Sequence, residues 1–203
     1  MRVLPSGSSA LLVELDDLEA VLALYAALEE RPPAGVVDVV PAARTVLVVV
    51  DPGRVTLAET EQAVRATTPR PGAGHAGDLV EVPVTYDGED LVDVARILGC
   101  APADVVRRHT GDQWTVAFCG FAPGFGYLTA ASGAWDVPRR SSPRTRVPAG
   151  SVALAGEFSG VYPRSSPGGW QLIGRTDVEV FDVHREPAAL LRPGTRVRFV
   201  EAR

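Results

Sequence analysis

The spacing of apolar residues divides the chain into a first part with two amphipathic helices and a second part built mainly of short strands. Apolar residues recur every three or four positions in helices, whereas β-branched runs and strict alternation indicate strands. In the first part these patterns predict strands at 10–15, 36–40 and 45–50 and helices at 17–30 and 56–67. This order lacks one strand of a ferredoxin-like split βαβ unit. We therefore predict a small ferredoxin-like α+β domain over residues 1–75.

Residues 68–78 contain prolines and glycines and almost no apolar side chains, so we predict that they form a linker. We place the domain boundary here and assign residues 76–203 to a second domain. Its patterns predict strands at 79–86, 113–119, 151–155, 160–162, 170–176, 178–182 and 196–200 and helices at 90–98 and 102–109. Many short strands with Gly- and Pro-rich connections and few helices are typical of a β-sandwich or a β-barrel.

Three segments rich in glycine, proline, arginine and aromatic residues interrupt these strands, at 120–128, 137–151 and 162–176. Glycine lets a ligand approach the backbone closely, and rings such as those of Phe121 and Phe125 supply flat apolar walls. Segments of this composition also occur as tight turns anchored by a buried ring. Because three of them occur in half of the chain, we favour one binding site assembled from several loops.

The second of these segments carries a run of arginines. Arg139, Arg140, Arg144 and Arg146 fall within eight residues. Guanidinium groups bind carboxylates and phosphates through two parallel hydrogen bonds, although such a run also occurs as a solvated basic loop. Proline neighbours restrict the backbone at Arg139 and Arg144, so we predict that these two bind an anion. Arg140 is predicted to point to solvent.

Two further side chains are candidates for chemistry. His109 stands at the predicted end of a helix, where it could transfer a proton near neutral pH or simply cap the helix. Cys119 lies in an apolar strand with no neighbour in sequence that would lower the pKa of its thiol, which favours a buried structural cysteine. The sequence contains no metal-binding motif of paired histidines or cysteines.

Composition excludes several classes of protein. A content of 46% hydrophobic and 22% charged residues is ordinary for a soluble domain, and a net charge of −5 argues against a nucleic-acid partner. Every basic residue is an arginine, so neither a Walker A lysine nor a Schiff-base lysine is present. Two cysteines without metal spacing, no signal-like segment and no membrane-length apolar run lead us to expect a cytoplasmic protein without membrane contact.

The loop segments resemble a known family. VPVTYDGEDL, GFAPGFGYL, VPR followed by PR and VPAGSV, and YP followed by SPGGWQLIGRT occur here in the order and spacing of the family of 5-oxoprolinase B subunits. That family also includes the kinase A inhibitor KipI and the first subunit of allophanate hydrolase. The resemblance implies a cyclophilin-like β-barrel in the second domain. It also implies a bacterial complex with 5-oxoprolinase subunits A and C that uses ATP, with Mg²⁺, to open 5-oxoproline to glutamate.

The same resemblance implies site residues and rival functions. It implies catalytic roles for His109, Arg139 and Arg144. The residues that it implies contact a small carboxylate substrate are Phe121, Pro123, Gly124, Phe125, Tyr127, Pro138, Gly150, Ser151, Gly168, Gly169, Trp170 and Arg175. The chain alone is expected to have little activity. A KipI-like inhibitor that binds a sensor histidine kinase and a subunit of the allophanate hydrolase or urea carboxylase type are the alternatives.

Overall fold

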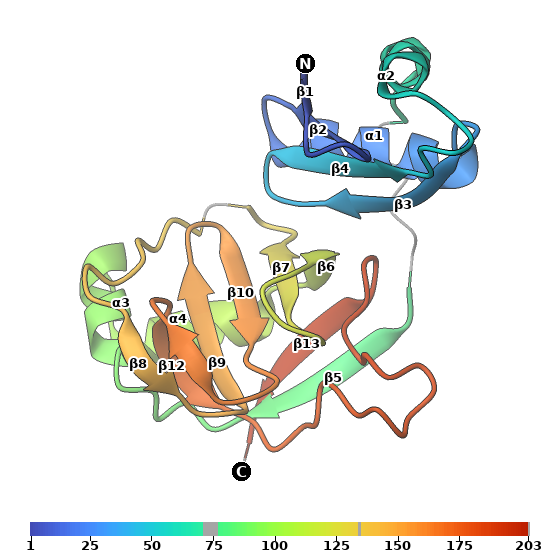
Figure 1. Cartoon of the computed structure of the whole chain (residues 1–203). Helices are drawn as coiled ribbons and strands as arrows, with labels where there is room; N and C mark the ends of the chain where they lie inside the picture. The colour runs from blue at the N-terminus through green and yellow to red at the C-terminus, as the bar shows by residue number, and fades with distance from the viewer. Residues whose placement is uncertain (71–76, 134, 203) are drawn as a thin grey trace. The chain divides into compact units, whose positions relative to one another are not determined.

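The computed structural model describes residues 1–70, 77–133 and 135–202. The chain divides into two compact units, Met1–Gly74 and His75–Arg203, and Figure 1 shows the elements of each. Residues 71–76, the centre of the predicted linker, lie outside the described residues, so the linker stays a prediction. Among the described helices, none has the length and apolar character needed to cross a membrane.

The first unit is a four-stranded antiparallel sheet with two helices. Its elements are β1 (Arg2–Pro5), β2 (Ala10–Glu14), α1 (Leu18–Glu30), β3 (Val36–Pro41), β4 (Thr45–Val50) and α2 (Leu57–Ala66). Both helices pack on the same face of the sheet, through a core that includes Val13, Val46 and Leu24. The predicted capping box of α2 is confirmed, because Thr56 Oγ1 accepts from the Glu59 amide at 3.2 Å and the Glu59 carboxylate accepts from the Thr56 amide at 2.9 Å.

The strand that the sequence pattern lacks comes from the N-terminal end of the unit. The sheet order is β1-β2-β4-β3, with β1 paired antiparallel to β2 along one edge. In a split βαβ unit this edge strand follows the second helix, whereas here it precedes the first strand. Mixed helices and strands are therefore as expected, and the ferredoxin-like class of the unit stays a prediction.

The second unit is built around a seven-stranded sheet of order β12-β9-β10-β7-β6-β13-β5. Its first elements are β5 (Leu79–Val84), α3 (Leu91–Leu98), α4 (Pro102–Gly111), β6 (Trp114–Cys119), β7 (Gly126–Ala130) and β8 (Arg144–Val147). The later ones are β9 (Ser151–Ala155), β10 (Phe158–Val161), β11 (Ser166–Gly168), β12 (Gln171–Arg175) and β13 (Arg196–Glu201). Figure 1 shows α4 lying behind the curved row of β12, β9 and β10.

Hydrogen bonds between the two outermost strands nearly close this sheet into a barrel. Thr85, directly after β5, exchanges two backbone hydrogen bonds of 2.8 and 2.9 Å with Arg175 at the end of β12. Closure of the sheet removes exposed strand edges, which is the usual solution for a sheet of this length. The second unit is thus a nearly closed β-barrel with few helices, as the pattern of short strands predicts.

Several strand boundaries differ from the predicted ones. The segment 120–128 is not wholly a loop, because β7 begins at Gly126 and pairs with β6. Two short strands inside the other Gly- and Pro-rich segments, β8 and β11, pair with each other in a separate two-stranded sheet. The predicted strand at 178–182 is wrong, since it forms only an isolated bridge between Phe181 and Ala189. The sequence pattern does not predict these two short strands, because glycine and proline, which are depleted in strands, lie in or beside them.

Both faces of β9 are buried, and the two faces belong to different cores. Along β9, Val152 and Leu154 point into the barrel core together with residues of α3 and α4. The alternate residues Ala153 and Ala155 contribute to a second, largely aromatic cluster on the other face. Successive side chains of a strand point to opposite faces, so this one strand separates the barrel interior from the aromatic cluster.

His109 lies inside the barrel core and is 0% exposed. Its Nδ1 lies 2.7 Å from the Tyr86 hydroxyl and its Nε2 lies 3.0 Å from Ser159 Oγ. The ring also stacks on Phe199, with 4.2 Å between centroids. This burial contradicts the predicted catalytic role, because a general acid or base must reach the proton that it transfers. A helix cap is also wrong, since both ring nitrogens face side-chain hydroxyls.

The environment of His109 favours the neutral ring. Burial lowers the pKa of His109 from its ordinary value of 6.5 to about 3, and the nearby Asp112 carboxylate offsets only part of that effect. A neutral imidazole donates at one nitrogen and accepts at the other, and each hydroxyl partner can serve in either role. His109 is therefore a hydrogen-bonded core residue that links α4 to β10 and to the end of β5.

The buried histidine should make stability depend on pH. Below about pH 6.5 the unfolded chain takes up a proton at His109 that the folded chain does not, so the free energy of unfolding decreases as the pH falls. This one site should contribute up to about 1.4 kcal/mol per pH unit between roughly pH 6 and pH 4. Urea unfolding at several pH values should show that His109→Gln flattens this slope, whereas the exposed His184→Gln does not. Parallel pH profiles for the native protein and His109→Gln would contradict the assignment.

Candidate ligand-binding site

A cluster of aromatic side chains covers the second face of β9, β10 and β12. Phe125, Tyr162 and Trp170 are buried in it. The Phe125 ring meets the rings of Tyr162 and Trp170 edge to face, with 5.3 Å between centroids in both pairs. Half-buried Tyr127 joins them at 5.1 Å from Phe125. Side chains from two of the predicted segments, Phe125 and Tyr127 from 120–128 and Trp170 from 162–176, thus lie in one cluster.

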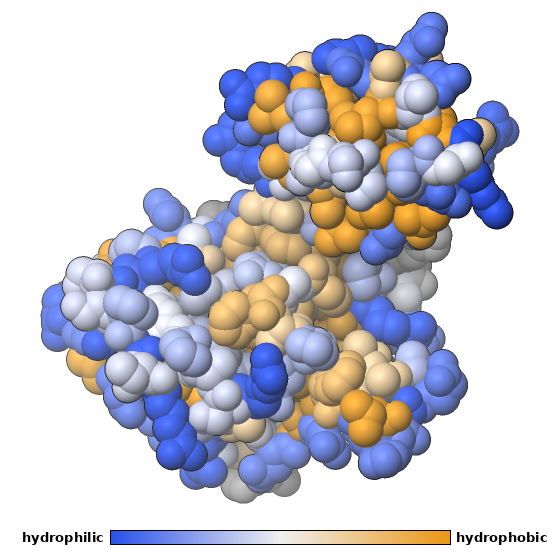
Figure 2. Space-filling view, viewed as in Figure 1, coloured by the Kyte–Doolittle hydropathy of each residue, from blue (hydrophilic) through white to orange (hydrophobic). Residues whose placement is uncertain are grey.

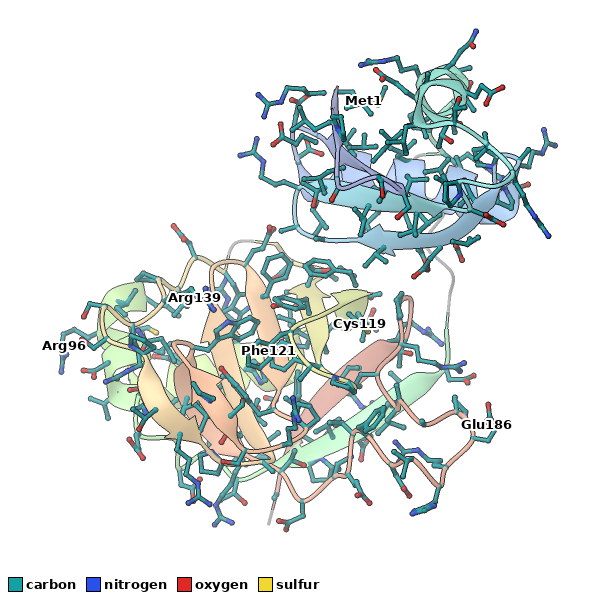
Figure 3. The ribbon with its side chains drawn as sticks, viewed as in Figure 1. Met1, Arg96, Cys119, Phe121, Arg139 and Glu186 are labelled. Carbon is teal, nitrogen blue, oxygen red and sulfur yellow. The ribbon has the colours of Figure 1, made fainter. Side chains whose placement is uncertain are left out.

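Phe121 extends this cluster to the surface. It is 58% exposed, and its ring lies 5.3 Å from Phe125 and 6.0 Å from Tyr162 between centroids. Figure 3 shows Phe121 on the open face of the second unit, and Figure 2 shows an apolar patch in the middle of that face with hydrophilic residues around it. The ring is a flat apolar surface available to a ligand.

The backbone at Phe121 is strained. Its φ is +66°, and the Ala122 amide donates to the Gly120 carbonyl at 2.7 Å, which makes Phe121 the centre of a tight three-residue turn. A bulky residue in the left-handed region is an outlier, because its side chain crowds its own backbone. Such strain costs on the order of 1–3 kcal/mol and is concentrated at functional sites.

Two predicted glycines are required by close contacts around the aromatic cluster. A Cβ at Gly168 would lie 2.4 Å from the Tyr162 hydroxyl oxygen. Gly124 has a φ of +80°, and a Cβ there would lie 2.4 Å from Cβ of Phe181. These glycines shape the loops that hold the rings, so their role here is structural support of the cluster.

The predicted anion-binding arginines are not equivalent, because two members of the arginine run bind a buried carboxylate. Asp90 is 2% exposed in its side chain, and Arg144 binds it through two hydrogen bonds of 2.8 and 2.9 Å. Arg140 binds the same carboxylate at 2.6 Å. Arg144 also reaches Glu89 at 3.0 Å. The structure therefore contradicts the predicted anion-binding role of Arg144, whose guanidinium already holds two carboxylates, and the prediction that Arg140 points to solvent.

The Asp90 carboxylate ties three parts of the second unit together. It immediately precedes α3, it accepts from Arg140 before β8 and from Arg144 at the start of β8, and it accepts from the Leu172 amide of β12 at 2.7 Å. Burial by itself would raise the pKa of Asp90. Hydrogen bonds from Arg144 and the Leu172 amide, with the charges of Arg144 and Arg140, outweigh it and hold the pKa below its ordinary value. The group is thus a structural anion.

Arg139 has a different environment from its neighbours. It is exposed, and over the described ranges it forms no ion pair or hydrogen bond. Its charge acts on Tyr127 and Tyr162, where it lowers the pKa of both phenols against the larger opposing effect of burial. Both tyrosines therefore stay neutral near pH 7, beside a cation that has no counter-ion in this part of the chain. Figure 3 shows Arg139 on the same face of the second unit as Phe121.

Arg175 lies away from this group. Gln171, at the start of β12, donates to the Pro138 carbonyl at 3.1 Å, which places the start of that strand beside the arginine segment. Arg175 is the last residue of the same strand and pairs with Asp87 at 2.8 Å. It borders a surface depression of about 340 Å³ next to the closure of the barrel. The structure does not bring Arg175 together with Arg139.

The remaining predicted residues belong to the scaffold around the cluster. The Gly169 carbonyl accepts from the Arg140 amide at 2.8 Å, and the Gly150 amide donates to the Tyr162 carbonyl at 2.8 Å. Ser151 is buried in β9, and its carbonyl accepts from the Tyr162 amide at 2.9 Å. Pro123 and Pro138 are exposed to solvent. A role in substrate contact stays a prediction for these residues.

Cys119 and the acidic residues offer no alternative centre for chemistry. Burial raises the pKa of the Cys119 thiol to about 11, and the thiol donates to the Leu191 carbonyl at 3.3 Å. A thiol with a raised pKa is a poor nucleophile at neutral pH. Across the ranges that the structure describes, His, Cys, Asp and Glu side chains form no group of three that could hold a metal ion.

Asp90 and Tyr162 matter to the site, although the sequence patterns did not assign them a role. The sequence pattern predicts Asp90 only as the start of a helix. The acidic pair Glu89–Asp90 and the later run of arginines together indicate that an ion-pair network could form. Tyr162 opens a Gly- and Pro-rich segment, and its ring bridges Phe121 and Phe125. A contact between residues more than thirty positions apart leaves no periodic signal in the sequence.

The sequence that forms this barrel and its aromatic cluster matches a known family. The model of the carboxyltransferase domain, subdomain C and D, matches residues 1–191. The chain therefore belongs to the carboxyltransferase domain family, subdomain C and D. It is 49% identical over 125 residues to the 5-oxoprolinase B subunit of Bacillus subtilis (strain 168), an alignment that covers 60% of this chain and 52% of that protein.

Other relatives agree with this family. The protein of the same name from Escherichia coli O157:H7 is 47% identical over 125 residues, which cover 60% of this chain and 57% of that protein. The chain thus spans about half the length of the curated relatives that it matches. The crystal structure of TTHA0988 is 39% identical, with a TM-score of 0.77, over 96% of this chain and 40% of that one. Urea amidolyase of K. lactis, 17% identical over 100% of this chain and 16% of that one, has a TM-score of 0.74 and shares the fold.

Removal of the Asp90 charge should destabilise the second unit. Asp90→Asn leaves Arg140 and Arg144 without their shared counter-ion in a largely buried setting, and loss of one partner of a buried pair costs about 3–5 kcal/mol. Glu89→Gln is the matched control, because Glu89 binds the same Arg144 but is 76% exposed in its side chain, where a pair is worth about 1 kcal/mol or less. Urea unfolding at pH 7 should separate the two variants clearly, and similar losses would contradict the central role of Asp90.

Proposed function

We propose that this chain acts as the B subunit of an ATP-dependent 5-oxoprolinase, which opens the lactam of 5-oxoproline to glutamate together with subunits A and C. The curated relatives that carry the name of the 5-oxoprolinase B subunit support this assignment. The observation that carries it on this chain is the cation of Arg139, which has no ion-pair or hydrogen-bond partner among the described residues and lies on the same face as the aromatic cluster. A guanidinium group binds the substrate carboxylate, and the aromatic rings contact the apolar edge of its five-membered ring.

The chain would supply binding and orientation rather than the phosphate chemistry. It has no lysine and therefore no Walker A loop to neutralise ATP phosphates, and Arg140 and Arg144 are occupied by Asp90. His109 is enclosed in the barrel core and does not reach this face. ATP and its Mg²⁺ would therefore be bound by groups outside the residues described above, and the isolated chain is expected to have little activity.

In this proposal Arg139 has one role, which is to bind the substrate. It binds the carboxylate through two parallel hydrogen bonds and fixes the ring so that the amide carbon is presented to the rest of the complex. The neutral hydroxyl of half-buried Tyr127 donates a hydrogen bond to the carboxylate without adding charge. Substrate thus enters as a monoanion and meets one cation.

The exposed ring of Phe121 also suits the alternative function, in which this face binds a sensor histidine kinase and inhibits it. The two functions differ in their requirement for Arg139 and for other subunits. A 5-oxoprolinase needs subunits A and C and hydrolyses ATP only in the presence of 5-oxoproline, whereas an inhibitor acts alone on a kinase. The urea amidolyase likeness supports the fold and not the choice between them.

Arg139→Ala should abolish most activity of the reconstituted complex with little change in stability. A charge-assisted hydrogen bond is worth about 1.5–3 kcal/mol, which corresponds to a loss of roughly ten- to hundredfold in kcat/KM. Exposed substitutions change stability by only about 0.5 kcal/mol, so the melting temperature should hardly move. Arg139→Lys should recover only part of the loss, because one ammonium cannot form the paired hydrogen bonds.

Arg146→Ala is the matched control for this measurement. Arg146 comes from the same segment and is exposed, but it donates to Ser165 Oγ at 3.2 Å instead of standing beside the tyrosines. The readout is 5-oxoproline-dependent ATP hydrolysis by the chain with subunits A and C. Full activity of Arg139→Ala would contradict the proposed role of Arg139. If the native chain with subunits A and C shows no 5-oxoproline-dependent ATP hydrolysis, the proposed function is wrong.

A further inference from the structure

The strained turn at Phe121 holds an aromatic ring at the surface at an energetic cost. The ring is 58% exposed, so burial of the side chain compensates for little of the strain at a φ of +66°. Glycine or asparagine would adopt this backbone conformation more easily, and either would remove an apolar ring from solvent contact. The stability of the unit alone therefore gives no reason for phenylalanine at position 121.

The contacts of Phe121 fix the ring without covering it. Its planes with Phe125 and Tyr162 meet at 73° and 83°, so both contacts are edge to face. Phe125 and Tyr162 are themselves buried in the cluster. A ring that is held at its edge by two buried rings, and is more than half exposed, is pre-organised for stacking with a flat molecule.

The charges around this ring define what the molecule carries. Hydrogen bonds on both sides of Arg139 place it along Trp170 of the aromatic cluster, because the Pro138 carbonyl accepts from Gln171 and the Arg140 amide donates to the Gly169 carbonyl. Figure 3 shows Arg139 on the same face as Phe121. Tyr162 and Tyr127 are neutral, since burial raises the pKa of both. The aromatic group around Phe121 therefore offers a flat apolar surface and one positive charge. Its complement is a compact ring with one negative charge.

We propose that Phe121 is the specificity-determining residue of this site, which selects cyclic monocarboxylates and rejects open-chain amino dicarboxylates. This inference rests on the proposed function, in which the cyclic substrate binds and the open-chain product leaves. Phe121 stacks on the ring of the ligand, and Arg139 binds its carboxylate.

Two physical differences produce the selectivity. An open-chain amino dicarboxylate carries an ammonium, which Arg139 repels, and a second carboxylate, which would lose its hydration on the aromatic face. It also has several rotatable bonds that must be ordered on binding, whereas the ring is already rigid. Ring opening therefore converts a ligand that fits the face into one that does not, which favours product release.

The experiment measures ligand binding to the full chain alone by titration calorimetry and by tryptophan fluorescence, to which Trp170 in the cluster contributes. The probes are 5-oxoproline, cyclopentanecarboxylate, 2-pyrrolidinone and glutamate. Cyclopentanecarboxylate keeps the ring and the charge, 2-pyrrolidinone keeps the ring alone, and glutamate keeps the charge without the ring. The two ring carboxylates should bind at least about tenfold more tightly than the other two, as expected for loss of one charged hydrogen bond or of the stacking contact.

Three variants separate the role of the ring from a structural role. Phe121→Asn should keep or raise the melting temperature, because it relieves the strained φ, and should weaken ring-carboxylate binding about five- to tenfold and reduce the preference over glutamate. Phe121→Tyr keeps a flat ring and should bind within about twofold of the native chain. Arg146→Ala should bind like the native chain.

Each outcome bears on the proposal. Equal binding of glutamate and 5-oxoproline, or unchanged selectivity in Phe121→Asn, would overturn the assignment of Phe121. A fall in melting temperature for Phe121→Asn with equal weakening of every probe would mean that the ring is structural, which also overturns it. If the chain binds ring carboxylates selectively but the reconstituted complex is inactive, the site stands and the proposed function fails. If the complex is active but the chain is unselective, the proposed function stands and the role of Phe121 fails.

Discussion

The buried carboxylate of Asp90 decides which arginines of the second unit are free to bind a ligand. It accepts hydrogen bonds from Arg140, from Arg144 and from the Leu172 amide. A carboxylate with 2% exposure is stable only if its charge is matched, so two guanidinium groups are withdrawn from the surface. The same ion pairs fix the segment before β8 against α3 and β12. Arg139, next in sequence to Arg140, is left at the rim of the aromatic cluster without a counter-ion among the described residues.

The two buried faces of β9 contribute to different parts of the second unit, one to the barrel core and the other to the aromatic cluster of the candidate site. The inner face encloses His109 among Trp114, Phe199 and aliphatic residues, where a neutral hydrogen-bonded ring adds to the packing. The outer face carries Phe125, Trp170 and the other rings of the cluster that ends in Phe121. Because β9 contributes alternate side chains to both faces, a change in its register would exchange the two sets. The rigid inner core thus holds the outer cluster in position.

The sequence predicts most helices and many strands because their signals are local. The Thr56 capping box, the left-handed Gly99 after α3 and the β-branched runs of β3 and β4 depend on residues a few positions apart. The site is predicted only in part. Phe125, Tyr127 and Trp170 converge as expected, but His109 and Arg144 do not, since their burial and pairing come from contacts with β10, β13 and Asp90. The spacing of arginines along the sequence shows that guanidinium groups could bind an anion. It does not show which carboxylate of the folded chain each guanidinium pairs with.

Two residues with unusual local properties, Phe121 and Arg139, lie on the same face of the second unit, and their shared position is the best guide to the site. The buried titratable groups Asp90 and His109 have hydrogen-bond partners, Asp90 in its arginines and His109 in two hydroxyls. Phe121 has a backbone that suits glycine, Arg139 has a charge with no partner in the described ranges, and both lie on the face of the aromatic cluster (Figure 3). A fold that is locally consistent elsewhere retains such exceptions where a ligand completes them. In the proposed function one ring carboxylate supplies both partners, because its anion binds Arg139 and its flat ring covers Phe121.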